Sequence, residues 1–455
     1  MNSEIKYNKH NKIGVLAPDI LMPNKEVDLE KWSVVACDQY TSQPEYWGKV
    51  SSFVGDSPST LNLIFPEVYL EEDNTGERIK NINNSMKKYI DDGIVIAHPS
   101  CFILIDRKTS HTESRKGLIM AVDLEEYDYN KGSQTLIRAT EGTVIERLPP
   151  RIRVRQNASM ELPHVMLLID DPERTVIEPL MQKISGYEKL YDFVLMMDSG
   201  YLKGYKIDDP QTVSSIIKAL ENLADREVFN RKYGVDNEKG VLLFAVGDGN
   251  HSLATAKACW ENIKKTLKSE DIENHPARYA LVELVNVHDD GLVFEPIHRV
   301  VFNVNFENVL NGLVDFLCDC NASYRMYETK EQMQKDAGDL SKNKKAHILP
   351  FITNKGYGLV VVDNPKCNLE VGTLQAFLDE LVKNDSTVKI DYIHGDDVVY
   401  SLGSKKGNIG FYLPSMNKND LFKTVILDGV LPRKTFSMGE ADEKRFYLEC
   451  RKISL

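Results

Sequence analysis

The chain has 455 residues, a length that favours two or three structural units over a single core. Its hydrophobic content of 42% and charged content of 27% are those of an ordinary globular protein, and no apolar run reaches the roughly 18 residues needed to cross a bilayer. The formal charge of −12 argues against nucleic-acid binding, which requires Lys and Arg to neutralise phosphates, but it leaves room for a small anionic ligand in a local basic pocket.

The N-terminal residues contain no apolar signal core, so we expect a cytoplasmic protein without membrane association. The seven cysteines are odd in number and include no Cys-x-x-Cys spacing, which is typical of reduced thiols. The closest pair, Cys318 and Cys320, follows an amphipathic run. We interpret it as a helix end, with a metal site as the alternative.

The first part of the chain predicts short strands and a helix. Apolar segments at 13–16 and 32–36 predict strands, and Asp38 follows the second one closely. Ligand sites of open α/β sheets gather at strand ends, so Asp38 is a candidate site residue; an ordinary turn is the alternative. The spacing of apolar residues then predicts a helix over 79–90 and antiparallel strands at 94–97, 101–105 and 118–122.

Residues 138–155 form a dense polar region that contains Arg138 and Glu141. Over 151–155 Arg alternates with Ile and Val, so a strand would present Arg151 and the next two arginines on one face. Three guanidinium groups on one face suit a carboxylate or phosphate partner. A solvated face paired with nearby Glu is the alternative.

The middle of the chain predicts alternating strands and helices. Apolar runs at 165–169 and 193–197 predict strands, and Asp209 followed by Pro210 predicts the start of a helix. The apolar, β-rich run 241–246 predicts a buried strand. This order indicates an α/β arrangement.

Six residues directly after that strand form the central candidate site. The apolar spacing beyond them predicts a helix, so they occupy a strand-to-helix turn. Glycines allow a sharp turn and close approach of a ligand, and the N–H groups at a helix start attract anions such as phosphate. The alternative is that the glycines only shape a loop while Asp248 or Asn250 caps the helix. The six residues are Gly247, Asp248, Gly249, Asn250, His251 and Ser252.

Residues 279–302 predict further strands. The adjacent residues His288, Asp289 and Asp290 cannot all face one ion from a strand, so we assign no metal ligands. His298 and Arg299 precede the strand at 300–302. After residue 303 the pattern changes to a separate C-terminal α/β unit, whose tail contains Lys434 and a predicted strand at 446–450.

With these residues identified, the chain resembles the bacterial family called domain of unknown function 1015 over nearly its full length. The resemblance is carried by six segments that are specific in combination, namely 34–39, 136–141, 162–172, 247–252, 294–300 and 431–436. The family is remotely similar to the fold of sulfiredoxin, ParB proteins and free-serine kinases, whose turn at a helix start holds nucleotide phosphates.

The resemblance implies an α/β protein with α+β elements. Residues 1–303 are expected to form a sulfiredoxin/ParB-like mixed-sheet domain that binds a nucleotide or phospho-ligand, and residues 304–455 a smaller α/β domain contributing to the same site. Many relatives carry Asp-Gly-His-His-Arg at the turn, whereas Asn250 and Ser252 replace a histidine and the phosphate-facing arginine here. Loss of such a charge-assisted hydrogen bond costs on the order of 1.5–3 kcal/mol.

The leading hypothesis is phosphoryl transfer between a nucleotide (ADP or ATP, with Mg²⁺) and serine, or removal of phosphate from phosphoserine. His251 and the backbone of 249–252 would hold the phosphate, while Glu141 or Asp38 would exchange the hydroxyl proton. Asp248 would help to hold Mg²⁺ or the loop. The expected cations are Arg138, Arg151, Arg299 and Lys434.

Two alternatives accompany this hypothesis. The first is a non-catalytic regulatory protein of the ParB-like fold that binds a nucleotide or metabolite, which the Ser252 replacement favours. The second is a metal-dependent hydrolase, for which the histidines show no recognisable ligand spacing. We expect Glu141, His251 and the pair His298–Arg299 to line one cleft. The partners considered are a small anionic ligand and a second copy of the chain, with no nucleic acid and no membrane.

Overall fold

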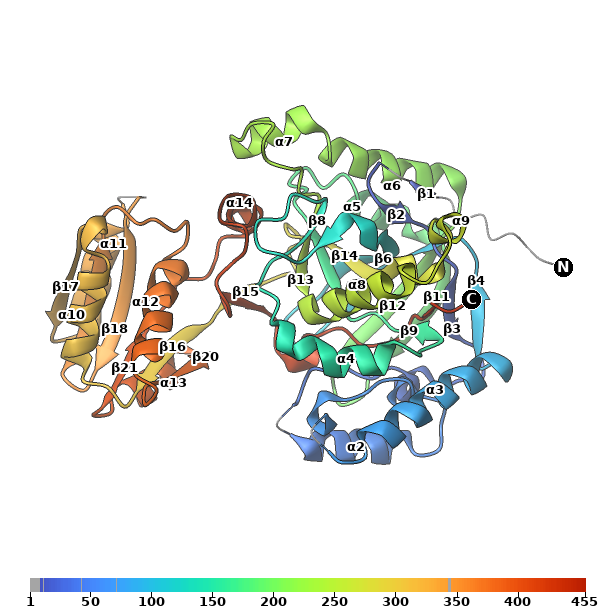
Figure 1. Ribbon diagram of the computed structural model, residues 1–455, viewed down its shortest axis with the longest axis horizontal. Coiled ribbons are helices and arrows are strands. Elements are labelled where there is room, and N and C mark those ends of the chain that lie inside the picture. Colours follow the sequence, from blue (N-terminus) through green and yellow to red (C-terminus); the bar gives the residue numbers. More distant parts are fainter. Residues whose placement is uncertain (1–8, 11, 42, 71, 343–344) are drawn as a thin grey trace. The chain divides into compact units, whose positions relative to one another are not determined.

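The computed structural model describes residues 9–10, 12–41, 43–70, 72–342 and 345–455. These residues form two compact units, each described by itself. Unit 1 comprises residues up to 293 together with 438–455, and unit 2 is the continuous segment 294–437. The chain therefore leaves unit 1, completes unit 2 and returns to unit 1 (Figure 1). The boundary expected near residue 303 lies inside unit 2, after its strand β16 (His298–Phe302).

Unit 1 is built around a mixed sheet, as expected. Its strands, in spatial order, are β11 (Glu188–Val194), β12 (Tyr201–Ile207), β5 (Phe102–Lys108), β6 (Arg115–Asp123), β14 (Tyr279–Asn286), β10 (Met166–Ile169), β13 (Phe244–Asp248), β8 (Ile137–Ala139) and β7 (Tyr127–Asp128). β2 (Val15–Leu16) also pairs with β6, and β1 (Lys9–His10) pairs with β2. Parallel pairs form between β10 and β14, β13 and β8, and β7 and β8.

Both faces of this sheet are buried under apolar side chains. Successive residues of a strand point to opposite faces, and β5 shows the result. Phe102 and Leu104 join one core cluster, whereas Ile103 and Ile105 join the other. All four are fully buried. A sheet covered on both faces explains why its strands appear in the sequence as continuous apolar runs.

Helices supply the cover on each face. Those of unit 1 are α1 (Leu29–Trp32), α2 (Pro44–Val54), α3 (Thr75–Asp91), α4 (Leu148–Arg155), α5 (Glu178–Met181), α6 (Pro210–Leu223), α7 (Arg226–Tyr233), α8 (Asn250–Lys264) and α9 (Ser269–Ile272). α6 and α8 contribute Leu220 and Trp260 to one cluster, and α2 contributes Trp47 to the other. None of the described helices combines the length and hydropathy that a membrane crossing requires.

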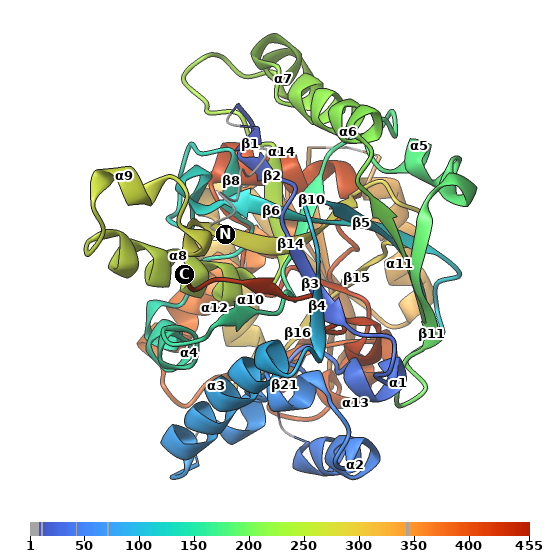
Figure 2. The same cartoon turned by 90° about the vertical axis from the view of Figure 1, so that its right-hand side faces the viewer.

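The C-terminal residues 438–455, called here the C-terminal return, run beside the N-terminal strands of unit 1. β23 (Arg451–Lys452) pairs with β9 (Met160–Glu161), and Cys450 forms a bridge to Leu21 of β3 (Ile20–Pro23), which itself pairs with β4 (Val95–His98). Figure 2 shows the return in dark red next to β3 and β4. The return is therefore a structural part of unit 1.

Buried ion pairs fasten this return. Glu161 is 6% exposed and accepts hydrogen bonds from the guanidinium groups of Arg451 at 2.8 Å and Arg155 at 2.5 Å, and from the Leu281 amide at 2.9 Å. Arg445 lies 2.8 Å from Glu283 on β14. Burial alone raises the pKa of Glu161, but the two arginines outweigh it and hold the pKa below its usual value.

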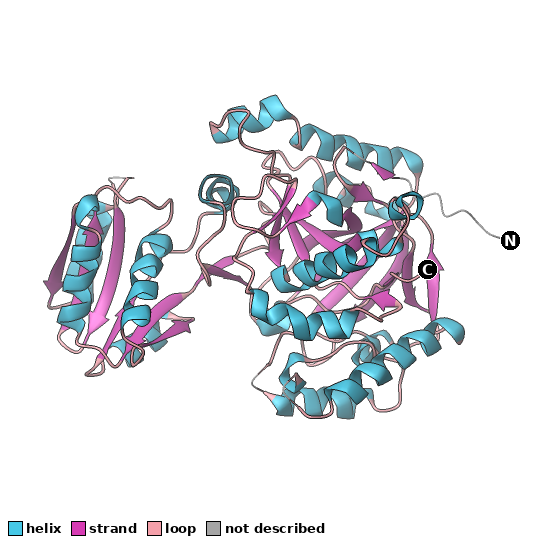
Figure 3. Cartoon of the chain, viewed as in Figure 1, coloured by secondary structure: helices cyan, strands magenta, loops and turns pink. Residues whose placement is uncertain are grey.

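Unit 2 contains an antiparallel sheet covered by helices (Figure 3). Its strands, in spatial order, are β17 (Ala322–Tyr327), β19 (Gly356–Val362), β18 (His347–Thr353), β21 (Asn408–Phe411), β16 and β20 (Lys389–Ile393). β15 (Phe294–Pro296) opens the unit, and β22 (Phe436–Met438) lies across its end at residue 437. Its helices are α10 (Phe306–Phe316), α11 (Lys330–Leu340), α12 (Glu370–Asn384), α13 (Asp396–Gly403) and α14 (Lys418–Asp428).

Several expected elements are confirmed and three are wrong. Asp209 does cap α6, with its side chain accepting from the Thr212 amide, and Pro210 is the first residue. Residues 151–155 belong to the helix α4, not to a strand. Residues 32–36 and 446–450 form isolated bridges and no continuous strand: Val35 pairs with Phe446, and Cys450 pairs with Leu21.

We predict that Glu161→Gln destabilises the protein by about 3–5 kcal/mol, because it leaves the buried guanidinium group of Arg451 and the half-buried one of Arg155 without a charged partner. The folded-state pKa of Glu161 lies below the unfolded value, so its contribution is present above pH of about 4.3 and is lost as the pH falls through the folded-state pKa. Urea unfolding over a pH series measures both effects. Glu221→Gln, at an exposed pair with Lys218, should cost less than about 1 kcal/mol. Equal losses in the two variants would contradict the role of Glu161.

Candidate functional site

The strand-to-helix turn between β13 and α8 is a constrained backbone structure. Gly249 has φ of +76° and is the N-cap of α8. A Cβ atom at this position would lie 3.0 Å from Cα of Val165, on the segment leading into the neighbouring strand β10. Both the backbone angle and the packing therefore require glycine at 249.

The start of α8 carries no side-chain cap among the described residues. Asp248 does not cap it, because its Oδ1 accepts the N–H of the adjacent Gly249 at 2.9 Å. The alternative in which Asp248 or Asn250 caps the helix is therefore wrong. An uncapped helix start presents partial positive charge, which is the requirement for binding an anion.

Asn250 ties a second loop to this turn. Its Oδ1 accepts the Thr140 N–H at 3.2 Å, and its Nδ2 donates to the Val246 carbonyl at 3.3 Å. The Thr140 hydroxyl donates to the same carbonyl at 2.6 Å. The Asn250 amide thus serves as a structural link between residues 139–141 and the turn.

His251 makes the next link to the same loop. Its Nε2 accepts the Val144 N–H at 3.3 Å, so in the neutral ring the proton lies on Nδ1. Glu141 is half-buried and lies between Thr140 and Val144, the two residues of this loop that bond the turn. The loop therefore brings the backbone of Glu141 close to the start of α8.

Asp248 meets a cation from the C-terminal return. Its Oδ2 lies 3.2 Å from Nζ of Lys444. Burial raises the pKa of Asp248, but Lys444 and then His164 outweigh this effect, so the pKa falls below its usual value. Asp248 is consequently ionised at neutral pH, and Lys444 is a cation at the turn that the sequence analysis did not select.

A partly buried hydrogen-bond chain connects the turn with the segment of Asp38. His164 lies against Gly249, where a Cβ atom would be 3.4 Å from its Cδ2. Its Nδ1 is 2.8 Å from the Tyr447 hydroxyl, which accepts the Cys37 N–H at 3.1 Å. Asp38, adjacent to Cys37, is half-buried. His164 and Tyr447 belong to the site but were missed, because no local pattern joins residues so far apart in sequence.

The two arginines expected to bind phosphate in unit 1 already have protein partners. Arg151 forms a two-pronged ion pair with Glu67, with bonds of 2.8 and 2.5 Å. Arg138 is 2% exposed, and its guanidinium donates to the carbonyls of Thr135, Gly240 and Val241. Arg138 therefore supports the fold in this structure, and its geometry does not favour a role in holding phosphate.

The remaining predicted residues lie in unit 2. Arg299 is fully buried and donates to the carbonyls of Arg433 and Lys434, both at 3.0 Å. Lys434 is exposed with φ of +54°, and His298 is buried. A cleft shared by these residues with Glu141 and His251 stays a prediction.

Within the described part of the chain, no group of three or more His, Cys, Asp and Glu side chains could hold a metal ion. His288 pairs with Asp170 at 2.6 Å, whereas Asp289 lies 3.4 Å from Lys116. The neighbouring residues His288 and Asp289 thus have separate partners. The turn instead combines an uncapped helix start, Lys444 and nearby carboxylates. This combination suits an anionic ligand together with a group that loses or gains a proton.

Comparison with known proteins gives one family and remote structural similarities. A family model described as "Protein of unknown function (DUF1015)" matches residues 20–381. No curated protein matches the chain. A mutant free serine kinase in complex with ADP has 11% identity and a TM-score of 0.37, over 74% of this chain and 92% of that chain.

Two further solved structures are similar at the same level. A conserved hypothetical protein from Pyrococcus furiosus has 11% identity and a TM-score of 0.35, over 74% of this chain and 95% of that chain. SbnI with a C-terminal truncation, from Staphylococcus aureus, has 8% identity and a TM-score of 0.33, with coverages of 70% and 83%. Similarities of this size do not establish a common function.

We predict that Gly249→Ala disrupts the turn, because alanine would be strained at φ of +76° and would crowd Val165. The expected loss of stability is about 1–3 kcal/mol, accompanied by loss of phosphate binding. Urea unfolding and phosphorus NMR titration measure the two effects. Gly142→Ala, in the adjoining loop with open space around its Cβ position, is the control and should change neither. Phosphate binding that survives in Gly249→Ala would rule out the turn as the anion site.

Proposed function

The chain belongs to the protein family of unknown function DUF1015, and from this premise we propose that it is a phosphotransferase acting at the turn of residues 247–252. The proposal is that a phosphoryl group passes between a nucleotide and serine, or is removed from phosphoserine. The single observation that carries it is the uncapped start of α8 at Gly249, beside the Asp248–Lys444 ion pair. Serine is the acceptor that the family resemblance implies.

In the proposed reaction the protein acts mainly by positioning and by charge stabilisation. The N–H groups at the start of α8 hold phosphate oxygens. Lys444 supplies the positive charge that the resemblance implies for an arginine at position 252, where this chain has serine. In transfer to serine, the hydroxyl oxygen attacks the terminal phosphorus, and the bond from that phosphorus to the bridging oxygen breaks. The nucleotide leaves with the electron pair of that bond.

Glu141 or Asp38 accepts the proton that the serine hydroxyl loses. Glu141 is the stronger candidate, because its loop is bonded to the turn through Thr140 and Val144. A general base of this kind must come within about 3.2 Å of the proton donor, or act through one water. The half-buried position of Glu141 allows it to contact both solvent and a bound substrate.

Mg²⁺ fits this site only together with a nucleotide. The described residues offer no cage of three ligands, but Mg²⁺ is commonly bound by one or two carboxylates plus substrate phosphates. Asp248 is the carboxylate of the turn that would hold it. When bound, the ion would neutralise charge on the phosphate oxygens.

A second candidate function is nucleotide or metabolite sensing without turnover. The observation that favours it is Ser252, which stands where the resemblance implies an arginine facing the phosphate. The two functions differ in one respect that can be measured, because a sensor binds the nucleotide without converting it.

We predict that Glu141→Gln lowers turnover by about a hundredfold or more while nucleotide affinity stays within a few fold, because the amide cannot accept the hydroxyl proton. Purified protein is incubated with ADP or ATP, Mg²⁺ and serine or phosphoserine, and nucleotide conversion is followed by chromatography. Glu146→Gln, at an exposed position of the same loop, is the control and should retain full activity. Binding without conversion in the native protein would favour the sensor. Neither binding nor conversion would refute both functions.

We predict that Ser252→Arg strengthens phosphate or nucleotide binding by about tenfold to a hundredfold, because it adds a charge-assisted hydrogen bond in the first turn of α8. Calorimetric titration of the native protein and the variant measures the change. Ser252→Gln, which is long but neutral, separates the effect of charge from that of size. Equal affinities in all three proteins would mean that position 252 does not face the anion.

A further inference from the structure

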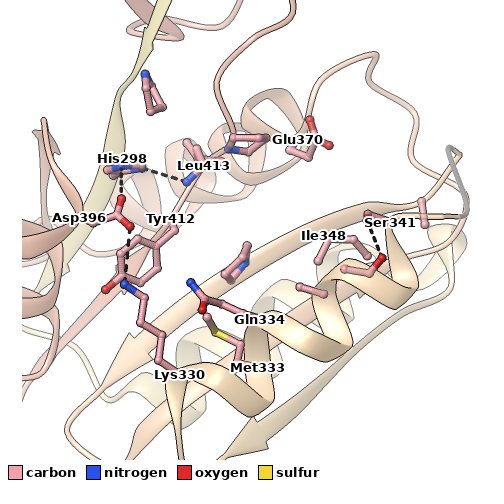
Figure 4. A pocket seen from close by; sticks show the side chains of 16 residues that line it. His298, Lys330, Met333, Gln334, Ser341, Ile348, Glu370, Asp396, Tyr412 and Leu413 are labelled. Atoms are coloured by element: carbon pink, nitrogen blue, oxygen red, sulfur yellow. Dashed lines mark hydrogen bonds and ion pairs between the residues drawn. The ribbon is translucent and has the colours of Figure 1, made fainter.

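Unit 2 contains a cavity of about 640 Å³ that is built entirely from its own residues. Helix α11 forms one wall, and residues from β16, β18 and the first turns of α12 and α13 form the others (Figure 4). Cavities of roughly 300–1,000 Å³ are typical of sites for small molecules. The volume therefore suits a metabolite-sized ligand.

At one end of the cavity the polar side chains bond to one another or to the backbone. His298 accepts the Leu413 N–H on Nδ1 at 3.0 Å, so its proton is on Nε2, which lies 3.2 Å from Oδ1 of Asp396. Nζ of Lys330 lies 3.8 Å from the other oxygen of Asp396. Lys330 thus balances the charge of Asp396, and both nitrogens of His298 have partners.

Glu370, which also lines the cavity, has no cationic partner among the described residues. It is the first residue of α12, and no Lys, Arg or His of the described residues forms an ion pair with it. Its own backbone N–H contacts its carboxylate, but burial and then the charge of Asp420 outweigh this contact and raise the pKa of Glu370. The lining of the cavity thus contains two carboxylates, Glu370 and Asp396, and one lysine, Lys330.

Between these groups the cavity wall is largely apolar. Met333 and Ala337 project from α11, Ile348 and Pro350 come from β18, and Leu413 adds a further apolar surface. Such a wall favours a ligand with a hydrocarbon body, because burying that body away from water is favourable. A fully polar ligand would leave this surface uncovered.

We infer that the cavity of unit 2 binds a small organic cation, with its ammonium group beside Glu370 and its apolar body against α11 and β18. The ammonium supplies the counter-charge that the protein does not provide for Glu370, which offsets the cost of desolvating that carboxylate. An anionic ligand of the same shape would meet the excess of carboxylates. The inference requires neither nucleotide nor serine, so it stands apart from the proposed function.

The test uses three probes of similar size, namely 2-phenylethylamine, 2-phenylethanol and 3-phenylpropionate, titrated into the full chain by calorimetry. The amine should bind about tenfold or more tightly than the alcohol, and the carboxylate should bind most weakly. Glu370→Gln should remove the advantage of the amine while leaving the affinity for the alcohol nearly unchanged. Glu380→Gln, on the same helix and paired with Lys383, is the matched control and should change neither affinity.

A cavity-filling variant keeps the test decisive if Glu370→Gln fails to fold. Ala337→Phe places a ring inside the cavity from α11 and should abolish binding of both the amine and the alcohol. Equal binding of the amine and the alcohol by the native protein would overturn the inference, as would no binding of any probe at millimolar concentration. Nucleotide conversion by the Glu370→Gln variant is measured separately, so failure here is distinguishable from failure of the phosphotransferase proposal.

Discussion

Buried ion pairs between the C-terminal return and the central sheet are the constraint on which unit 1 depends. Glu161 and Glu283 are almost fully buried, and each is paired with an arginine of the return. A buried charge that loses its partner costs about 3–5 kcal/mol, so both carboxylates require the return to be in place. The return also carries Lys444 and Tyr447. The charges that hold the fold together therefore also position two groups of the candidate site.

The candidate sites of the two units owe their charge preference to different groups. In unit 1 the polar feature is mainly backbone, because Gly249 turns the chain so that α8 starts without a side-chain cap. In unit 2 the feature is a side chain, since Glu370 lines the cavity without an ion pair to any described cation. A backbone site selects anions and tolerates changes of nearby side chains. A site based on one carboxylate selects cations and depends on that residue alone.

Much of the fold was accessible from the sequence, because apolar periodicity and caps such as Asp209–Pro210 are local signals. The strand-to-helix turn was found for the same reason. Residues 151–155 were wrongly predicted as a strand because Arg alternates with Ile and Val there. The two prolines before them, Pro149 and Pro150, lie in the first turn of α4, a position that proline favours, and they were the signal for a helix. Lys444, Tyr447 and His164 could not be assigned, since only the folded chain brings residue 447 to residue 164. The burial of Arg138 could not be predicted, because two of its three carbonyl partners, Gly240 and Val241, are distant in sequence.

The division of unit 1 between two stretches of chain sets an order for folding during synthesis. A ribosome releases residues up to 293 first, then the whole of unit 2, and only afterwards the return. Domains generally fold as units when their residues are available. Unit 2 can complete its core at once, whereas Glu283 lacks Arg445, and Glu161 is paired with Arg155 alone, until the return is synthesised. The first unit to be synthesised is thus the last to reach its native state.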